Sequence, residues 1–166
     1  MNTLMQKTQM AKQADSDLLQ LVIFRLGEEE FGVDIMAVQE IIKMPAITVI
    51  PQAPEYVAGV INLRGRIIVV ISLGKKFDIQ SCDKNDEYKV IVVELENQII
   101  GMMVDSVSEV LRIPSSSVDA APDIIRSGVS SNYIQGVGKL DDRLLILLDL
   151  RNVLSEYETE ELSQLV

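Results

Sequence analysis

The chain has 166 residues, of which 48% are apolar and only 4% aromatic, and it carries a formal net charge of −10. It contains no histidine and a single cysteine, Cys82, which excludes Ser-His-Asp and Cys-His catalysis, histidine metal sites and an intrachain disulfide. Most of the negative charge lies in residues 81–166, whose net charge is −9 against −1 for residues 1–80. Such a surface repels a polyanion, so we expect no binding to nucleic acid.

The N-terminal residues 1–17 are polar and lack the apolar core of a signal peptide. We expect this segment to be disordered. No window of the sequence approaches the roughly 18 uninterrupted apolar residues of a membrane-spanning helix. These features predict a cytoplasmic protein that does not insert into a membrane by itself.

Short strands are predicted from residue 19 onward. Apolar residues fill Leu19–Leu26, and apolar residues alternate with glycine and aspartate over Phe31–Ile35, which predicts two strands joined by a tight turn. Residues 36–44 predict a short turn followed by a third strand. That strand ends before Pro45, because proline restricts the residue that precedes it.

A hairpin is the clearest local feature of the first half. We expect one helical turn first, begun near Pro54 and ended by Gly59. The hairpin then covers Val60–Leu73 with its turn at Arg64-Gly65, where glycine supplies the positive φ of a tight turn. Its second strand, Ile67–Ile71, is continuously apolar, which predicts burial on both faces.

The second half of the chain repeats the first after a polar connection at residues 75–85. The matches include, at an offset of 69 residues, Val22–Leu26 with Ile91–Leu95, Glu40 with Glu109 and Pro45 with Pro114, and, at an offset of 77, Tyr56 with Tyr133, Arg66 with Arg143 and Ile67–Leu73 with Leu144–Leu150. The change of offset places an eight-residue insertion between about Pro122 and Tyr133. Two copies are too few for a solenoid, so the repeat predicts two similar subdomains that share an apolar interface.

The fold class expected from these elements is all-β (mainly β): two small five-stranded barrels, packed together, with short helices. Closing each sheet removes the exposed edges that would otherwise aggregate. The repeat halves cover about residues 18–80 and 87–155, and the sequence leaves open whether each barrel is contiguous or the halves exchange strands. The spacing of leucines from Leu150 predicts a C-terminal amphipathic helix to about Tyr157, and residues 156–166 form an acidic tail.

Candidate catalytic groups are few. Asp34 and Asp105 lie near strand ends but are not paired by the repeat, and the hydroxyl cluster Ser115–Ser117 has no neighbouring base and is expected to form a turn before a short helix. No glycine-rich phosphate loop occurs. We therefore expect no catalytic, cofactor-binding or metal site.

The most specific candidate site is a charged pair in the first half. Glu40 stands in an otherwise apolar segment, so its carboxylate must be paired or presented to a partner. Arg64, in the hairpin turn, is a suitable ion-pair partner because guanidinium binds carboxylate bidentately. Glu109 matches Glu40 in the second copy, but Asp141 stands where Arg64 would be. This asymmetry predicts a pair that exists in one copy alone, and it favours an interface role over a purely structural salt bridge, although the two roles are compatible.

The pattern as a whole resembles a known family. The motifs that carry the resemblance follow one another over about residues 18–155: Phe31-Gly-Val-Asp-Ile35, Val38-Gln-Glu-Ile41, Ile61-Asn-Leu-Arg-Gly65, Val69-Val-Ile-Ser-Leu73, Gly101-Met-Met-Val-Asp-Ser-Val107 and Leu145-Ile-Leu-Leu-Asp149. They are similar to those of the CheW family of bacterial chemotaxis coupling proteins. One departure is Ser72, which stands where that family usually has aspartate.

The resemblance implies two SH3-like β-barrels and an adaptor that is not an enzyme. It implies binding to the helix-bundle cytoplasmic tips of methyl-accepting chemoreceptors and to the regulatory domain of the histidine kinase CheA, with recruitment to membrane receptor arrays and possible self-association in rings. Matched position by position, the expected receptor-interface residues are Ile35, Val38, Glu40, Gly59, Arg64 and Val110. The expected kinase-interface residues are Ile42, Met44 and Ile47.

Two alternative functions remain at this stage. Within the family, the chain could serve a related chemosensory pathway that controls surface motility or another output. Outside it, small barrels also bind nucleic acids, but that function needs a basic groove with exposed aromatic residues. The net charge of −10 and the absence of tryptophan oppose it.

Overall fold

The computed structural model describes residues 18–80, 88–95, 97–120 and 133–153. The expected disorder of residues 1–17, the insertion after Pro122 and the acidic tail all lie outside these ranges. The described residues form mostly strands, with short helical turns between them: β1 (Leu18–Leu26), β2 (Glu29–Asp34), η1 (Ile35–Ala37), β3 (Val38–Lys43), β4 (Val57–Leu63), β5 (Arg66–Ser72), α2 (Leu73–Lys76), β6 (Lys89–Leu95), β7 (Gln98–Val104), β8 (Ser106–Pro114), η3 (Ser115–Ser117), β9 (Val118–Asp119), β10 (Ile134–Leu140), β11 (Arg143–Leu148) and α3 (Leu150–Val153).

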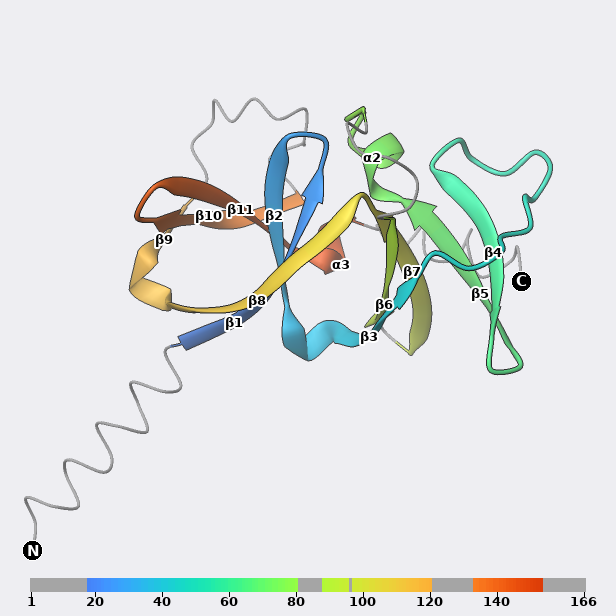
Figure 1. The fold of residues 1–166 in the computed structure, drawn as a ribbon, viewed down its shortest axis with the longest axis horizontal. Coiled ribbons are helices and arrows are strands. Elements are labelled where there is room, and N and C mark those ends of the chain that lie inside the picture. Colours follow the sequence, from blue (N-terminus) through green and yellow to red (C-terminus); the bar gives the residue numbers. More distant parts are fainter. Residues whose placement is uncertain (1–17, 81–87, 96, 121–132, 154–166) are drawn as a thin grey trace, which may run out of the picture.

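These strands make two sheets that lie side by side (Figure 1). The first sheet, which we call barrel A, has the order β8-β1-β2-β11-β10-β9, and the second, barrel B, has the order β3-β6-β7-β5-β4. Neighbouring strands are antiparallel except β2 with β11 and β5 with β7. The expected all-β fold with two similar barrels is confirmed.

The two halves of the sequence exchange strands. The 69- and 77-residue offsets make β1 and β2 the equivalents of β6 and β7, and β3, β4 and β5 the equivalents of β8, β10 and β11. Barrel A therefore contains the first two strands of the first half and the last four of the second (β8 to β11), and barrel B contains the last three strands of the first half and the first two of the second. The repeat halves are not the spatial units of the molecule, because each barrel needs both of them.

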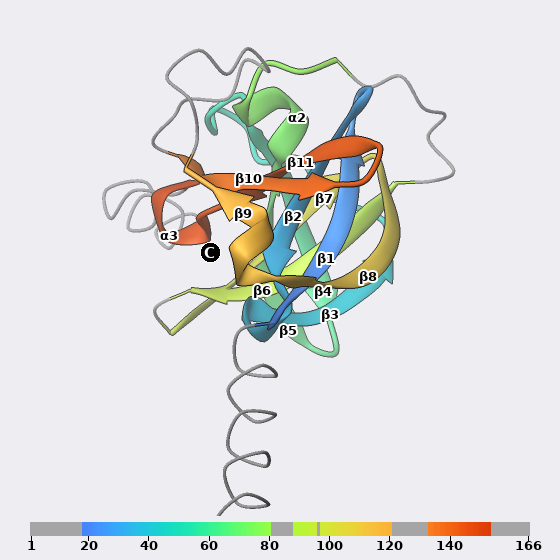
Figure 2. The same ribbon diagram turned by 90° about the vertical axis from the view of Figure 1, so that its left-hand side faces the viewer.

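Each barrel is closed by the segment of chain that follows the strand at one edge of its sheet, β8 in barrel A and β3 in barrel B. In barrel A, β8 pairs with β1, and the same chain continues through η3 into β9, which pairs with β10 (Figure 2). In barrel B, the chain after β3 makes one bridge at Thr48, whose backbone exchanges hydrogen bonds of 2.9 and 2.8 Å with Val60. Barrel A thus has the extra short strand β9 in addition to the five strands expected.

Glycine permits this closure in both barrels. At Gly59, where φ is +149°, an added Cβ would lie 2.3 Å from the carbonyl oxygen of Thr48. At Gly136, which is equivalent to Gly59 in the repeat, it would lie 2.8 Å from the carbonyl oxygen of Asp119. The closing chain therefore passes directly over a glycine in each barrel, and any side chain there would displace it.

The apolar core has three parts. The largest cluster lies between the barrels and takes residues from both, including Phe24, Phe31 and Phe77. Each barrel also has its own smaller core, and most members of the two cores are repeat equivalents. The smaller cores consist of Leu21, Ile23, Ile113, Leu145 and Leu147 in barrel A and of Ile61, Ile68, Val70, Val90 and Val92 in barrel B. The expected shared apolar interface between the subdomains is present.

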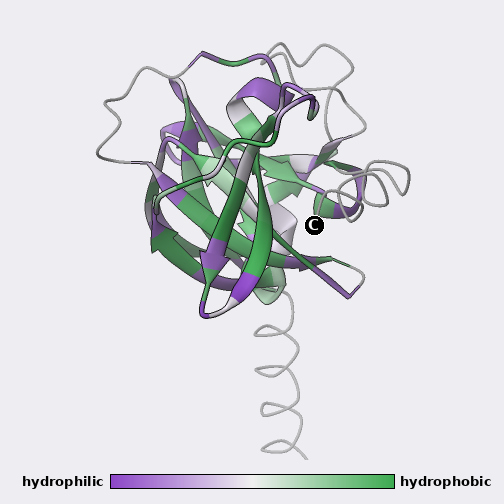
Figure 3. Ribbon diagram, turned by 90° about the vertical axis from the view of Figure 1, so that its right-hand side faces the viewer, coloured by the Kyte–Doolittle hydropathy of each residue, from purple (hydrophilic) through white to green (hydrophobic). Residues whose placement is uncertain are grey.

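The hairpins are confirmed, with one correction to burial. β4 and β5 pair from Leu63 and Arg66 outward, and β10 and β11 pair in the same way around Asp141-Asp142. The strands are mostly hydrophobic and the turns hydrophilic (Figure 3). Ile67, however, is 52% exposed, so β5 is buried on both faces only from Ile68 onward.

Three further expectations about helices and strand ends were wrong. No helical turn follows Pro54: the backbone of Val57 donates to the carbonyl of Pro54 at 2.9 Å and then enters β4, where pairing with β5 replaces helical hydrogen bonds. β2 ends at Asp34, because Ile35 begins η1. Ser115–Ser117 form the 3-10 turn η3, and the strand β9 follows it directly in place of the expected short helix.

The polar connection expected from residue 75 begins inside the short helix α2. Ser72 caps α2 by accepting a hydrogen bond from the backbone of Lys75 at 3.3 Å. Its equivalent, Asp149, accepts one from the backbone of Arg151 at 3.0 Å at the start of α3. Serine is a good substitute for aspartate at a helix start, so the departure at Ser72 preserves the local structure. The C-terminal helix is described only as far as Val153.

Candidate interaction surface

The charged pair predicted in the first half exists. Glu40 lies on β3 directly after a register shift between Val38 and Glu40 that marks a β-bulge. A bulge changes the direction of the following side chain, and the carboxylate of Glu40 accepts a hydrogen bond from Nη2 of Arg64 at 2.7 Å. The pair connects β3 to the β4–β5 turn on the outside of barrel B.

The backbone of that turn is unusual at the arginine. Arg64 has φ of +52° and Gly65 of +85°, as in a type I′ turn, where both central residues need positive φ. Asn62 stabilises the turn by accepting a hydrogen bond from the backbone of Gly65 at 2.9 Å. A Cβ makes this conformation unfavourable, so glycine is common at the first central position. Asparagine is also common there, because its short polar side chain makes local hydrogen bonds. The arginine therefore occupies this position at a local cost in backbone energy.

The two members of the pair differ in exposure. The side chain of Arg64 is 73% exposed, whereas that of Glu40 is 24% exposed. The ion pair leaves most of the guanidinium accessible, with donors available for a second acceptor. The arrangement orients a cation on the surface of barrel B.

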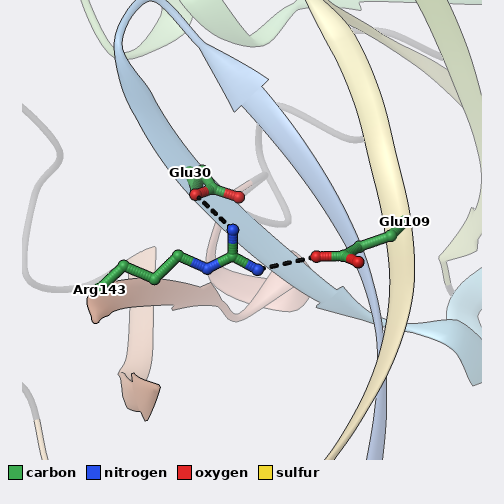
Figure 4. Close-up of polar contacts among 3 residues, drawn as sticks. All are labelled: Glu30, Glu109 and Arg143. Carbon is green, nitrogen blue, oxygen red and sulfur yellow. Dashed lines mark hydrogen bonds and ion pairs between the residues drawn. The ribbon is translucent and has the colours of Figure 1, made fainter. Parts of the chain in front are cut away.

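A similar pair occurs in barrel A, which corrects the sequence-based expectation that only the first half forms one. Arg143 at the start of β11 donates from Nη2 to Glu109 on β8 at 2.7 Å, and its Nη1 lies 3.3 Å from Oε1 of Glu30 on β2 (Figure 4). The hydrogen bond to Glu109 raises the pKa of Arg143, reduced hydration opposes this, and the charges of Glu30, Glu109 and Asp142 raise the pKa further.

The Glu40–Arg64 pair in barrel B therefore has a counterpart in barrel A. Glu109 also follows a bulge in its strand, so a carboxylate after a bulge, bound to an arginine of the following hairpin, is a repeated structural feature. The arginines come from different places: the turn in barrel B and the second strand in barrel A. Asymmetry therefore lies in the exposed, positive-φ position of Arg64 and not in the existence of the pair.

The other expected receptor-interface residues are distributed between the barrels. Ile35 begins η1 and Val38 follows it, and both are half-buried against the large core between the barrels. Val110 lies on β8 of barrel A, opposite Val22, and is 53% exposed. Gly59 is buried beneath Thr48, so its structural role is sufficient to require glycine.

The expected kinase-interface residues gather on barrel B. Ile42 on β3 and the two residues Met44 and Ile47 beyond it are all partly buried and pack against the core of barrel B. Alternate residues of β3 face outward, and among them Ile41 is 38% exposed. The outer face of β3 is therefore formed by Ile41 and the residues that alternate with it, and not by the expected Ile42.

Sequence reasoning missed two residues. Met36 in η1 is 85% exposed, and the signal for it was the repeat itself, which matches Met36 with the aspartate Asp105. Arg143 was matched with Arg66, and the alignment gave no sign that its side chain reaches Glu109. Arg143 lies two residues after Asp141, the turn residue that is equivalent to Arg64.

The candidate catalytic groups have structural partners. Asp34 accepts a hydrogen bond from the backbone of Met36 at 2.9 Å, and the buried Asp105 accepts one from the backbone of Gly27 at 2.8 Å. Within the described ranges, no cluster of three or more acidic, cysteine or histidine residues is arranged to hold a metal ion. In the same part of the chain, no helix is long and apolar enough to cross a membrane.

Comparisons with known proteins agree with this architecture. A family model described as a CheW-like domain matches residues 20–158. The chain is 36% identical to the chemotaxis protein CheW of Treponema pallidum, covering 91% of both chains, and 37% identical to that of Klebsiella aerogenes, covering 84% of this chain and 83% of the relative. A crystal structure of the scaffolding protein TtCheW from Thermoanaerobacter tengcongensis superimposes with a TM-score of 0.78 at 36% identity, covering 84% of this chain and 90% of that one.

Proposed function

Because this chain belongs to the CheW-like family, we propose that it is a chemotaxis coupling adaptor, which binds the cytoplasmic tip of a chemoreceptor with one surface and the regulatory domain of the histidine kinase CheA with another. The family match over residues 20–158 is the observation that carries this proposal. Relatives named as chemotaxis proteins and a similar structure named as a scaffolding protein support it. The adaptor itself performs no chemistry and acts in the cytoplasm, recruited to receptor arrays.

The proposed receptor surface contains Ile35, Val38, Glu40, Arg64 and Val110. Apolar residues would supply buried contact area, and the Glu40–Arg64 pair would fix orientation and partner choice. Arg64 supports this assignment because it is 73% exposed and occupies a backbone conformation that disfavours arginine. Backbone strain of this kind is often retained for function. Gly59 would contribute indirectly, by letting the chain at Thr48 close the barrel.

The proposed kinase surface is the outer side of barrel B around β3 and the chain that follows it. Ile42, Met44 and Ile47 would hold this segment in shape through their packing on the core of barrel B. Two similar barrels also allow one barrel to meet the opposite barrel of a neighbouring molecule. Such head-to-tail contacts close into rings when the rotation permits, which is the geometry proposed here for mixed or self-associated rings.

Signal transfer would then depend on how much of the receptor is in each of its conformations. A receptor conformation that binds the adaptor differently changes the arrangement of the bound kinase, and no new bond is made. Service in a related chemosensory pathway uses the same two surfaces with a different output. Nucleic-acid binding is disfavoured by the net charge of −10.

The test is a three-component sedimentation assay with the full chain, a receptor cytoplasmic fragment and the kinase regulatory domain. The wild-type chain should sediment with each partner and with both together. Arg64→Glu should lose the receptor and keep the kinase domain, because it places a negative charge beside Glu40 and removes the exposed cation. Circular dichroism checks that the variant is folded. Failure of the wild-type chain to bind either partner would contradict the proposal.

A further inference from the structure

Met36 is the most exposed of the large hydrophobic residues in the described part of the chain, with 85% of its surface accessible. It is not part of an irregular loop. Its backbone N–H donates to Oδ1 of Asp34 at 2.9 Å, and the backbone of Val38 donates to the carbonyl of Ile35, which closes the 3-10 turn η1. The thioether side chain is therefore held outward on an ordered turn.

The repeat shows that this exposure is not a requirement of the fold. The equivalent residue, Asp105, is 7% exposed. Its backbone N–H donates to the carbonyl of Arg25 at 3.1 Å, and its carboxylate binds the backbone N–H of Gly27. The same place in the other half is thus turned inward and polar, so the exposed methionine is a specific property of the first half.

The position of η1 relates Met36 to the proposed receptor surface. This turn joins β2 of barrel A to β3 of barrel B and lies at the junction of the two barrels (Figure 1). Ile35, at the start of the turn, and Val38, directly after it, pack on the core between the barrels and belong to the proposed receptor surface. Met36 extends the same apolar segment into solvent.

We propose that Met36 is a direct apolar contact residue for the helical receptor tip and helps to determine which tips are bound. This inference rests on the proposed function. An unbranched thioether has three rotatable bonds and adapts to gaps between side chains on a helix surface. It would enter such a gap, while the oriented cation of Arg64 supplies the polar part of recognition.

The test measures binding of the full-length chain to the receptor fragment and, separately, to the kinase domain. Met36→Gln should weaken receptor binding about tenfold, or about 1.4 kcal/mol, because it replaces an apolar contact by a polar group of similar size. Met36→Leu should stay within about threefold of wild type, since volume-conserving apolar exchanges are well tolerated. Kinase binding should not change. Leu144→Gln is the matched control, because Leu144 is 67% exposed and lies on β11 of barrel A, outside both proposed surfaces.

The outcomes separate this inference from the proposed function. If the wild-type chain binds the receptor fragment, Arg64→Glu does not, and Met36→Gln binds as tightly as wild type, the role of Met36 is refuted while the receptor surface stands. Equal weakening by Leu144→Gln would also refute it, by showing a general effect of surface apolarity. If the wild-type chain does not bind the receptor fragment, both proposals fail together.

Discussion

Arg64 is the residue at which local stability and proposed function oppose each other. Its positive φ disfavours any side chain with a Cβ other than asparagine or aspartate, by about 1–2 kcal/mol. Its ion pair with Glu40 offsets part of that cost, but an exposed pair contributes only about 0.2–1 kcal/mol. The presence of arginine at this turn is therefore better explained by a partner than by stability.

We predict that Arg64→Asn leaves the free energy of unfolding within about 1 kcal/mol of wild type, because the gain in turn propensity balances the lost ion pair. Receptor binding should nevertheless fall. Chemical denaturation followed by circular dichroism measures the first quantity, and sedimentation with the receptor fragment measures the second. A folded Arg64→Asn variant that binds receptor normally would assign Arg64 no role in the interface.

Each strand that closes a barrel, β3 or β8, contains a bulge followed by a glutamate. An arginine of the following hairpin binds the carboxylate of that glutamate. In barrel A, Arg143 binds carboxylates from both β8 and β2, so a single side chain connects three strands. The hairpins were predictable, because apolar strands on both sides of a two-residue turn, Arg64-Gly65 or its repeat equivalent Asp141-Asp142, are a local signal. The arginine–glutamate contacts in barrel A were not, because the side chain crosses between strands that are distant in sequence.

Arg143→Leu should lower the melting temperature, because Glu30 and Glu109 would then lie near one another without the intervening cation. Since the pKa of Arg143 is raised in the folded protein, its contribution is present below its ordinary pKa and is lost only at strongly alkaline pH, so the difference from wild type should be constant between about pH 6 and about pH 9. Arg143→Lys keeps the charge and should lose less. An unchanged melting temperature for Arg143→Leu at low salt would show that the contacts contribute nothing measurable.

The exchange of strands between the two sequence halves connects the two barrels of the molecule. The sequence repeat indicated two barrels but not this exchange, because pairing of β1 with β8 joins residues about 90 positions apart, and no local pattern encodes such a partner. The large core between the barrels adds a second connection. Both features predict that the barrels unfold together.

Leu145→Ala in barrel A and Ile68→Ala in barrel B occupy equivalent positions and are both buried. Each should lower the free energy of unfolding by about 2–5 kcal/mol and shift one common transition. Denaturant unfolding, followed by circular dichroism, tests this. Two separated transitions, each moved by only one of the variants, would mean that the barrels are independent domains.

We propose that this chain makes the activity of the kinase depend on receptors. The most direct measurement is autophosphorylation of full-length CheA in the presence of receptor-containing membranes, with and without this protein. The wild-type chain should make the rate respond to receptor ligand, and Arg64→Glu should not, although it still binds the kinase domain. A ligand response of equal size without the protein, or with Arg64→Glu in its place, would contradict this role.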